Sequence, residues 1–310
     1  MTEKQQAKIT VVGSINMDLM IRASNLPLPG ETVIADSKVE NPGGKGANQA
    51  VAAARMGASV TMIGCVGDDS FATQLLENLA EENVDTSRIT RRENTASGVA
   101  VVMVEESGEN AILVVPGANA LVNQQEIEQA RQVISDSDVL LMQLEVPQEI
   151  VAYTTQIARD AGVPVILDPA PAPLECCADL LNVDLICPNQ SEVAALLGKP
   201  VESMDDAVSL MKELTQLGPK QAIITMGEQG AVVFDGETVQ TVPSFAVEAI
   251  DSTAAGDAFA AGIAVRLAEH ASLIEAVQFA SAAGALAASG AGAQTAMPTR
   301  EQIETLLKQQ

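Results

Sequence analysis

Residues 139–167 read VLLMQLEVPQEIVAYTTQIARDAGVPVIL and contain one complete unit of the predicted fold. Short apolar runs at 139–142 and 163–167 flank an amphipathic stretch at 147–161. The same alternation recurs, with apolar runs at 9–13, 60–64, 184–187 and 222–225 and helical patterns at 45–56, 70–82, 190–197 and 204–217. Such runs fit strands buried on both faces of a parallel sheet. The sequence therefore predicts a doubly wound α/β fold, a mostly parallel sheet flanked by helices, with ligands bound beyond the carboxyl ends of its strands.

Two segments depart from this alternation. Residues 32–39 follow a turn rich in proline and glycine, and residues 98–104 and 111–115 form a predicted hairpin across 105–110. We expect antiparallel strands of a small β-sheet lid, made by segments at about 17–40 and 97–116 of a single domain spanning 1–310. Because an exposed apolar sheet face usually needs covering, a homodimer through this sheet is predicted.

Composition and charge limit the partners. Hydrophobic residues make up 47% of the 310 residues and aromatic residues 2%, so the core must be aliphatic and rich in alanine. A formal net charge of −24 repels nucleic acid and anionic membranes, and neither is an expected partner. The same field repels phosphorylated ligands at long range. Any phosphate site must therefore be local, built from backbone amides, a metal ion and a few basic side chains.

Targeting signals and metal-ligand patterns are absent from the sequence. The first eight residues lack the apolar core of a signal peptide, and the uncharged stretch 276–299 is too rich in Ala, Gly and Ser to span a bilayer. The cysteines have neither zinc-ligand spacing nor a disulfide framework; they are Cys65, Cys176, Cys177 and Cys187. We expect free thiols and a cytoplasmic location. His270 is the only histidine, which makes histidine acid–base chemistry improbable.

Residues 251–257 read DSTAAGD and run into a helix-like stretch at 258–267. Small residues permit a tight turn whose backbone N–H groups converge on one point, and the positive end of the next helix favours an anion there. Asp257 would stand beside that anion, where a carboxylate suits deprotonation of a hydroxyl that attacks a phosphoryl group. The alternative is an ordinary helix N-cap, because aspartate is favoured at that position in any case.

Residues 41–48 read NPGGKGAN and precede a helix. They are not a Walker A loop, because Gly46 follows Lys45 where that motif needs Ser or Thr. One interpretation is close backbone approach to a polyhydroxylated ligand, with donors from Gly44, Lys45 and Asn48. The other is a glycine turn with a solvent-exposed lysine.

Polar residues also follow several predicted strands. Asn16 and Asp18 lie two apart on an extended segment, so both side chains can face a sugar, unless the segment is an Asx turn. Glu145 lies at the end of an apolar run, where an acid would face a ligand. Asn189 and Glu192 are three apart on one helical face, and either orient Mg²⁺ and phosphate or form a capping box.

Residues 225–230, TMGEQG, are a strand end followed by a turn bracketed by glycines. Such a turn has room for a nucleotide, although any hairpin turn has a similar pattern. Each of these segments is a weak signal by itself, and their order along the chain carries more information than any one of them.

Together, the segments resemble the PfkB-type carbohydrate kinases over nearly the whole chain. GGKGANQA at 43–50 is similar to the N-terminal signature of that family, and DSTAAGD at 251–257 to its C-terminal signature. VPGAN at 115–119 and DPAPA at 168–172 also resemble family segments. The resemblance implies a doubly wound domain with a small β-sheet lid, lids that pair in a homodimer, and MgATP-dependent phosphorylation of D-ribose at O5.

The resemblance also implies roles for individual residues. The sugar would be held by Asn16, Asp18, Gly44, Lys45, Asn48 and Glu145. Asp257 would be the general base, beside an anion hole made by the amides of Ala254, Ala255, Gly256 and Asp257. ATP and its Mg²⁺ would contact Asn189, Glu192, Thr225, Met226, Gly227, Glu228, Gln229, Gly230, Gly256 and Ser281. An activating K⁺ or other monovalent cation would be bound around Asp251, Thr253, Ala287, Gly290, Gly292 and Ala296, where Ala296 departs from the serine that the family often has.

Two alternative functions stay open. One is a related kinase whose acceptor is deoxyribose, fructose or a nucleoside, which assays with competing acceptors would separate. The other is a catalytically silent regulator that binds a sugar or nucleotide. The combination of Gly256, Asp257, Asn189, Glu192 and Lys45 argues against the regulator, because a silent protein has no need of a base.

Overall fold

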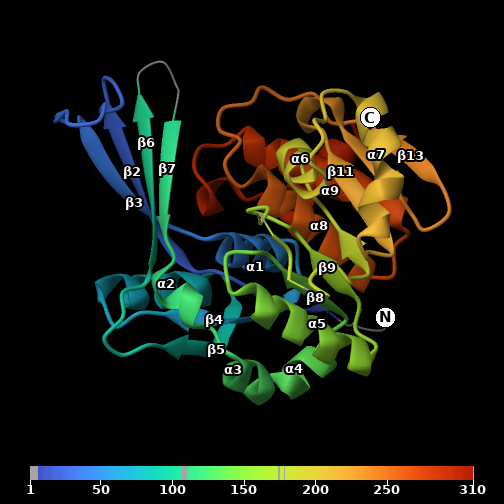
Figure 1. Cartoon of the computed structure of the whole chain (residues 1–310), viewed down its shortest axis with the longest axis horizontal. Coiled ribbons are helices and arrows are strands. Elements are labelled where there is room, and N and C mark those ends of the chain that lie inside the picture. Colours follow the sequence, from blue (N-terminus) through green and yellow to red (C-terminus); the bar gives the residue numbers. More distant parts are fainter. Residues whose placement is uncertain (1–5, 106–109, 174, 178, 310) are drawn as a thin grey trace.

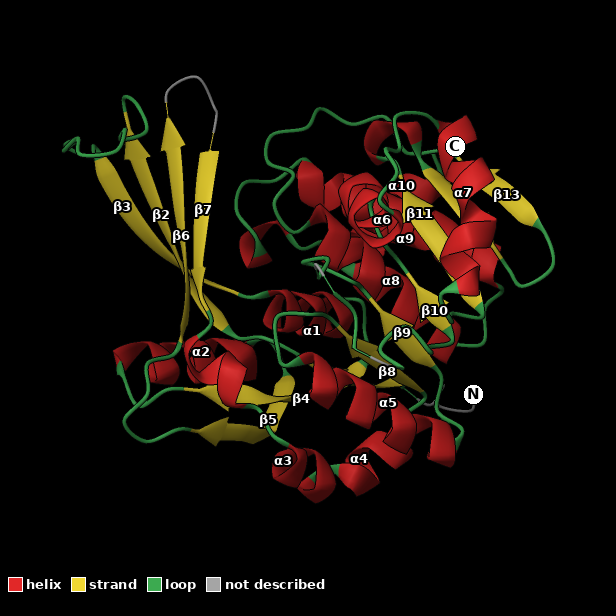
Figure 2. Cartoon of the chain, in the orientation of Figure 1, coloured by secondary structure: helices red, strands yellow, loops and turns green. Residues whose placement is uncertain are grey.

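The computed structural model describes residues 6–105, 110–173, 175–177 and 179–309, whose strands form a nine-stranded and a four-stranded sheet (Figures 1 and 2). In spatial order the large sheet contains β13 (Val239–Val242), β12 (Ala231–Phe234), β11 (Gln221–Thr225), β10 (Leu185–Ile186), β9 (Val165–Leu167), β8 (Val139–Met142), β1 (Lys8–Val12), β4 (Ser59–Val66) and β5 (Val84–Arg91). All neighbours from β5 to β11 are parallel, and β12 and β13 extend one edge antiparallel. The predicted doubly wound, mostly parallel sheet is confirmed.

Helices cover both faces of the large sheet. One core layer contains side chains of α1 (Lys45–Arg55), α2 (Ser70–Glu81), α8 (Ala255–Ala268), α9 (Leu273–Ala288) and α10 (Arg300–Leu307). The other contains side chains of α3 (Gln124–Gln129), α4 (Arg131–Ser135), α5 (Gln148–Ala161), α6 (Gln190–Leu197) and α7 (Met204–Gln216). Strand β8 shows how the layers divide, because Val139 and Leu141 face the first and Leu140 and Met142 the second. This two-residue period in an all-apolar strand is what a sheet buried on both faces requires.

Small residues let α8 and α9 pack closely in the first layer. A Cβ atom added to Gly262 would lie 2.9 Å from the Cα of Ala280 on the facing helix. Glycine and alanine therefore let the middle of α8 pack directly against the backbone of α9.

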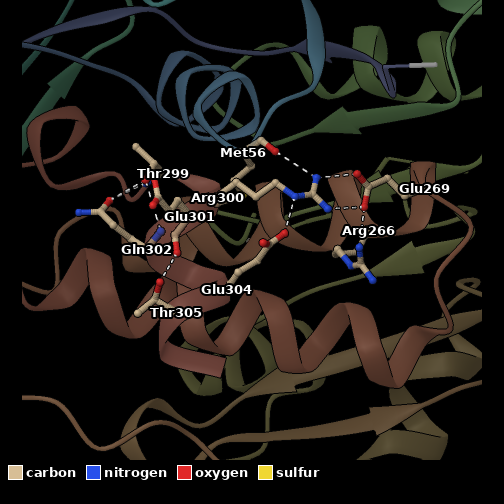
Figure 3. A network of polar contacts seen from close by, with 9 residues as sticks. All are labelled: Met56, Arg266, Glu269, Thr299, Arg300, Glu301, Gln302, Glu304 and Thr305. Atoms are coloured by element: carbon tan, nitrogen blue, oxygen red, sulfur yellow. Dashed lines mark hydrogen bonds and ion pairs between the residues drawn. The ribbon is translucent and has the colours of Figure 1, made fainter. Parts of the chain in front are cut away.

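The C-terminal helix α10 is fastened to the ends of α1 and α8 (Figure 3). Arg300 donates hydrogen bonds to Glu269, the residue that follows α8, at 2.6 Å and to the carbonyl oxygen of Met56 at 3.3 Å. It also pairs with Glu304 one turn along α10, and Thr299 and Gln302 form a capping box at the start of this helix. The contacts hold α10 against the layer that carries α8.

The order of the large sheet places a crevice beside β1. This strand pairs with β4 on one side and β8 on the other. The strands that follow β4 and β8 in the sequence therefore extend the sheet to opposite sides of β1. At such a point the connections diverge at the carboxyl ends of the strands and leave room for a ligand. The residues after β1 and β8 are therefore the first place to look for a functional site.

The small sheet projects from the rest of the molecule, at the upper left of Figure 1. Its order is β3 (Ser37–Gly43), β2 (Asn16–Ala23), β6 (Gly98–Glu105) and β7 (Asn110–Val115). Several large apolar side chains on it are about half exposed or more, namely Val39, Ile112, Leu113, Val114 and Val115. The expected turn of the β6–β7 hairpin falls mainly on 106–109, outside the described residues.

The strand predicted at 32–39 is wrong in its position. Residues 31–35 have no strand structure, and β3 covers Ser37–Gly43 instead. The pairing explains the difference, because Ser37 lies opposite Arg22 and β2 ends one residue later at Ala23. Residues 31–35 thus lie beyond the end of their partner strand, and Ile34 is 88% exposed despite its preference for strands.

Candidate active site

Asp257 lies in the first turn of α8, a helix that packs against β1 and β8. The N-cap of this helix is Ala254, so the alternative in which Asp257 is the cap is wrong. Ala254 has a φ of 64°, a left-handed conformation that costs a residue with a Cβ roughly 1–2 kcal/mol. Strain of this kind is typical of functional turns.

The turn before α8 leaves only part of the predicted anion hole available. The N–H of Ala255 donates to the carbonyl oxygen of Ser252 at 3.2 Å, so this amide is already used inside the turn. The N–H groups of Gly256 and Asp257 belong to the first helical turn, where no carbonyl lies one turn earlier to accept them. Gly256 is exposed, and a Cβ atom on it would meet no atom within 4 Å. Gly256 therefore borders open space, with the buried Asp257 next to it.

Two consecutive residues of α1 hold the carboxylate of Asp257. Asn48 Nδ2 donates to one of its oxygens at 2.9 Å and Gln49 Nε2 to the other at 3.0 Å. Asp257 is only 4% exposed, so both contacts are shielded from water. The side chain is fixed in orientation while it stays close to the exposed turn.

Gln49 also joins Asp257 to a second buried acid. Its Nε2 donates to Asp168 at 2.8 Å. Its Oε1 accepts from Gln143, the residue that directly follows β8. Gln49 and Gln143 are fully buried. Burial raises the pKa of Asp168 to about 8, although the charge of Lys45 opposes the shift; Glu192 and Asp257 add to it.

The residues after β1 form a second polar cluster, which includes Asn16. Asn119 Nδ2 donates to Asn16 Oδ1 at 2.7 Å, and Asn119 Oδ1 accepts from the N–H of Ile15 at 3.0 Å. Asn16 and Asn119 are almost fully buried, so their amide orientations are fixed by each other. Burial, together with the charges of Glu145 and Asp257, raises the pKa of Asp18 to about 7.

Glycines surround this cluster because no other residue fits. A Cβ atom on Gly43 would lie 2.0 Å from a carboxylate oxygen of Asp18, and one on Gly98 would lie 2.1 Å from Asn16 Oδ1. Gly44 has a φ of 89° and would place a Cβ atom 2.7 Å from the backbone nitrogen of Asn16. The glycine turn before α1 therefore serves close packing against Asn16 and Asp18.

Glu145 and Lys45 complete the cluster. The backbone N–H of Lys45 donates to Glu145 Oε2 at 3.2 Å, and Ser14 Oγ donates to the same oxygen. Glu145 lies three residues after the end of β8, not at the end of a longer strand as the apolar run indicated. Burial lowers the pKa of Lys45, but four carboxylates around it, with Asp257 the largest contributor, raise it above its usual range. Lys45 is therefore a fixed cation.

A cavity of about 740 Å³ opens between the small sheet and the loop after β8. Its lining includes Asn16 and Asn119 from one side, Glu145 and Gln148 from the other, and Val114 of β7. The cavity is thus bordered by part of the polar cluster and by one strand of the small sheet.

Asn189 and Glu192 form the capping box that was one of the two interpretations. Asn189 Oδ1 accepts from the N–H of Glu192 at 2.9 Å, and the Glu192 carboxylate accepts from the N–H of Asn189 at 2.8 Å. Burial raises the pKa of Glu192, and the charge of Asp257 acts in the same direction while Lys45 opposes it. Glu192 therefore belongs to the same electrostatic cluster as Asp257, and the cap does not exclude a role toward phosphate.

The predicted nucleotide residues are brought together in part. Asn189 and Thr225 form an isolated parallel bridge, which places the start of α6 beside the end of β11. The η2 turn (Gly227–Gln229) that follows is exposed, whereas the side chain of Met226 is buried in the core and does not face a ligand. Ser281 lies one turn before Gly284, a residue that contacts the first turn of α8.

The residues predicted around a monovalent cation lie in two joined segments. Asp251 accepts hydrogen bonds from the N–H groups of Thr253 at 2.9 Å and Gly292 at 3.0 Å. Burial opposes ionisation of Asp251, but these hydrogen bonds keep its pKa below the usual value. The carbonyl of Ala287 accepts from Gly290, and Ala296 packs against Gly290. The described residues contain no cluster of three acidic, Cys or His side chains able to hold a metal ion. A cation here would rely on carbonyl oxygens.

Five residues of the site were not singled out from the sequence, namely Ser14, Gln49, Asn119, Gln143 and Asp168. Gln49 lies inside the GGKGANQA block and Asn119 inside VPGAN, so the segments were found but these side chains were not singled out. Nothing in the sequence distinguishes Gln143, because its importance depends on the contact with α1.

Comparison with known proteins agrees with this geometry. The family described as pfkB family carbohydrate kinase matches residues 6–300. Ribokinase of Haemophilus influenzae is 39% identical over 300 residues, which cover 97% of this chain and 98% of that protein. Deoxyribokinase of Salmonella typhi is 34% identical over 96% of this chain and 98% of that protein. The solved structure of Arabidopsis thaliana ribokinase complexed with ribose and ATP has a TM-score of 0.90 and 31% identity, over 98% of this chain and 99% of that one.

Proposed function

This chain belongs to the pfkB family of carbohydrate kinases, and from that premise we propose that it transfers the γ-phosphoryl group of ATP to O5 of D-ribose. The observation that carries the proposal is the position of Asp257. Its buried carboxylate belongs to the first turn of α8, is held by Asn48 and Gln49, and is near enough to Asp18 for the two charges to interact. A base between an acceptor site and an anion site is the arrangement that phosphoryl transfer to a hydroxyl requires.

The polar cluster holds the sugar in the proposed mechanism. Carboxylates and amides pair well with vicinal hydroxyls, and here they are supplied by Asn16, Asp18, Lys45, Asn48 and Glu145, with the backbone of Gly44. The small sheet covers the sugar and excludes water, which limits hydrolysis of ATP. Fixed partners such as Asn119 for Asn16 keep the acceptor in one orientation, and this lowers the entropy cost of reaching the transition state.

Asp257 accepts the proton of the 5-hydroxyl as that oxygen attacks the γ-phosphoryl group in line. The bond from the γ-phosphorus to the bridging oxygen breaks, and ADP leaves. Gln49 and Asn48 are positioning residues that aim the Asp257 carboxylate at the hydroxyl. The amides of Gly256 and Asp257 face the transferred group and stabilise its charge.

Mg²⁺ bound with ATP would neutralise charge on the phosphate oxygens. The residues present fit such an ion, because Mg²⁺ usually keeps several waters and needs only one or two carboxylates besides the phosphates. Glu192 and Asn189 would hold it through water. We expect Glu192→Gln to raise the Mg²⁺ concentration needed for half-maximal rate by about tenfold. A Mg²⁺ titration checks this, and an unchanged midpoint would leave Glu192 with the capping role alone.

A potassium ion or other monovalent cation is also proposed as an activator. The support is the carboxylate of Asp251, which accepts from Thr253 in the turn before α8 and from Gly292 in the other segment, so that the second bond joins the two segments. A cation there would hold carbonyls on one side and leave the turn amides directed at the phosphoryl group, so activation would be structural. Ala296 provides no hydroxyl ligand.

The small sheet is proposed to pair two copies of the chain in a homodimer. The support is the exposed apolar surface of β7, where Ile112 and Leu113 are 56% and 62% exposed. Surfaces of this kind are usually covered by a partner. The four cysteines are free thiols, which suits the proposed cytoplasmic location. No described helix is long and apolar enough to cross a membrane.

The test is release of ADP in the presence of ATP, Mg²⁺ and D-ribose, with K⁺ and Na⁺ exchanged. Turnover with ribose that rises with K⁺ is the expected result. Equal turnover in both salts would keep the kinase and reject the cation activator. A higher kcat/KM with deoxyribose or a nucleoside than with ribose would identify that compound as the acceptor. No turnover with any of these acceptors would favour a silent binding protein.

A further inference from the structure

Two adjacent thiols line the cavity that is also bordered by two of the proposed acceptor residues, Asn16 and Glu145. Cys176 is exposed and Cys177 is half-buried, whereas Cys65 and Cys187 are buried. Cys176 and Cys177 border the cavity of about 740 Å³ together with Asn16 and Glu145. They also border a neighbouring cavity of about 530 Å³. The pair therefore lies between the two hollows, within reach of a ligand that enters either of them.

The thiol pair is tied to the start of α5. Gln148, the first residue of that helix, accepts from the N–H of Cys177 at 3.0 Å and donates to the carbonyl oxygen of Glu175 at 3.2 Å. Gln148 lines the same cavity, three residues after Glu145. A group bound to the thiols is thereby held close to the acceptor residues.

The surroundings favour chemistry of the thiol over that of the thiolate. Although Cys176 is exposed, partial loss of hydration beside the protein surface raises the pKa of its thiol, and its neighbour Cys177 adds to the shift. Burial also raises the pKa of Cys177, assisted by the charges of Glu149 and Asp179. Alkylation and disulfide exchange need the thiolate and are slowed by such shifts. Trivalent arsenicals, in contrast, condense with neutral thiols and bind two of them at once.

We propose that Cys176 and Cys177 form a dithiol site for trivalent arsenicals, and that a group bound there blocks the acceptor cavity. With phenylarsine oxide, two As–S bonds form, and the two thiol protons leave with the arsenic-bound oxygen as one water molecule. Arsenic stays trivalent and neither sulfur is oxidised. The site itself is independent of the proposed function, whereas the blocking rests on it.

The test is incubation of the intact protein with a small excess of phenylarsine oxide, followed by gel filtration, intact mass and kinase assay. We expect one arsenical per chain, mapped to the peptide that contains both thiols, and at least about a tenfold loss of kcat/KM for ribose. Dimercaptopropanol should restore activity, and saturating ribose should slow uptake. The Cys176→Ser/Cys177→Ser double variant should keep its activity and take up nothing, while each single serine variant should lose the arsenical on dialysis.

Uptake by the double variant, or an adduct mapped to Cys65 or Cys187, would overturn the site. An adduct on Cys176 and Cys177 that leaves kcat/KM for ribose unchanged would overturn the blocking. Because the adduct is measured by mass, it does not depend on activity: a chain that takes up arsenic but phosphorylates no sugar would reject the proposed function alone. If the double variant does not fold, peptide mapping of the wild-type adduct decides the same question.

Discussion

The two sides of the active site are built in opposite ways. Around Asn16 and Asp18 the chain is closely packed, since Asn119 donates to Asn16 and a Cβ atom on Gly43 would overlap the Asp18 carboxylate at 2.0 Å. Around Gly256 the chain is exposed, and an added Cβ atom would meet nothing within 4 Å. The sugar is neutral and is distinguished by shape and hydrogen bonds, which need rigid walls. The nucleotide brings its own charge and metal, which need open space and a few amides.

The largest effect should come from the group shared by both sides. Replacement Asp257→Asn removes the base but keeps the size of the side chain, and we expect kcat to fall by about a thousandfold with little change in ribose affinity. Calorimetric titration with ribose and steady-state kinetics measure the two quantities. A variant with nearly normal kcat would show that another group accepts the proton.

The second effect tests the rigid side. Gly43→Ala forces Asp18 or β3 to move, so we expect a loss of about a hundredfold in kcat/KM for ribose and about 1–3 kcal/mol in the free energy of unfolding. Denaturant melts and kinetics check the two parts. Normal ribose kinetics in this variant would mean that the close packing around Asp18 is unnecessary.

Gly256→Ala is the matched change on the open side. Its φ is not in the left-handed region and its surroundings are empty, so we expect the free energy of unfolding to stay equal or rise by about 0.5 kcal/mol. The added methyl group occupies space beside the phosphoryl site, and kcat should fall by at least about tenfold with the ribose KM nearly unchanged. Destabilisation of this variant would contradict the contrast between the two sides.

The smallest effect is a pH dependence of the rigid side. With the pKa of Asp18 raised from 3.8 to about 7, its acceptor form increases as pH rises, and kcat/KM for ribose should grow by roughly tenfold between about pH 6 and pH 8. The pKa of Asp168 is also raised, to about 8, so this residue changes charge in the same pH range. The measurement is therefore the difference between the pH profiles of kcat/KM for wild type and for Asp18→Asn. Parallel profiles in the two proteins would remove Asp18 as the cause.

The same shift has a consequence for stability, with a definite sign. Because the folded carboxyl binds a proton that the unfolded chain has released, the contribution of Asp18 to the free energy of unfolding is present below about pH 4 and is lost as pH rises through about 7. Above about pH 7, Asp18 is ionised and can accept hydrogen bonds from a ligand, but in this range it no longer contributes to the free energy of unfolding.

Much of the fold could be predicted from the sequence because buried parallel strands are continuous apolar runs. The run at 139–142 coincides with β8, and the helix at 190–197 coincides with α6. The misplaced strand at 32–39 shows the limit, since β3 begins where a partner strand is available and Ile34 lies beyond it. Strand pairing is a property of two segments, and periodicity reports on only one.

The site was predictable where the motif is local and hidden where it depends on packing between elements. The turn at 251–257 identified Asp257, because small residues before a helix have a recognisable pattern. Gln49 looked like any polar helix residue, and only the approach of α1 to α8 reveals that it joins Asp257 to Asp168. Asn189 and Glu192 show a third case, in which one pattern satisfies a helix cap and also places a carboxylate near Lys45.

The connections of the small sheet also have a thermodynamic consequence. Strand β2 begins at Asn16 and β3 ends at Gly43, so two of the proposed acceptor residues, Asn16 and Asp18, lie at the base of that sheet, whereas Asp257 belongs to α8. A rotation of the sheet would displace the sugar contacts relative to the base. A partner that binds the sheet and favours one orientation of it, such as a second copy of the chain, would then change the affinity for sugar by some factor. By linkage, sugar alters the affinity between the copies by that same factor.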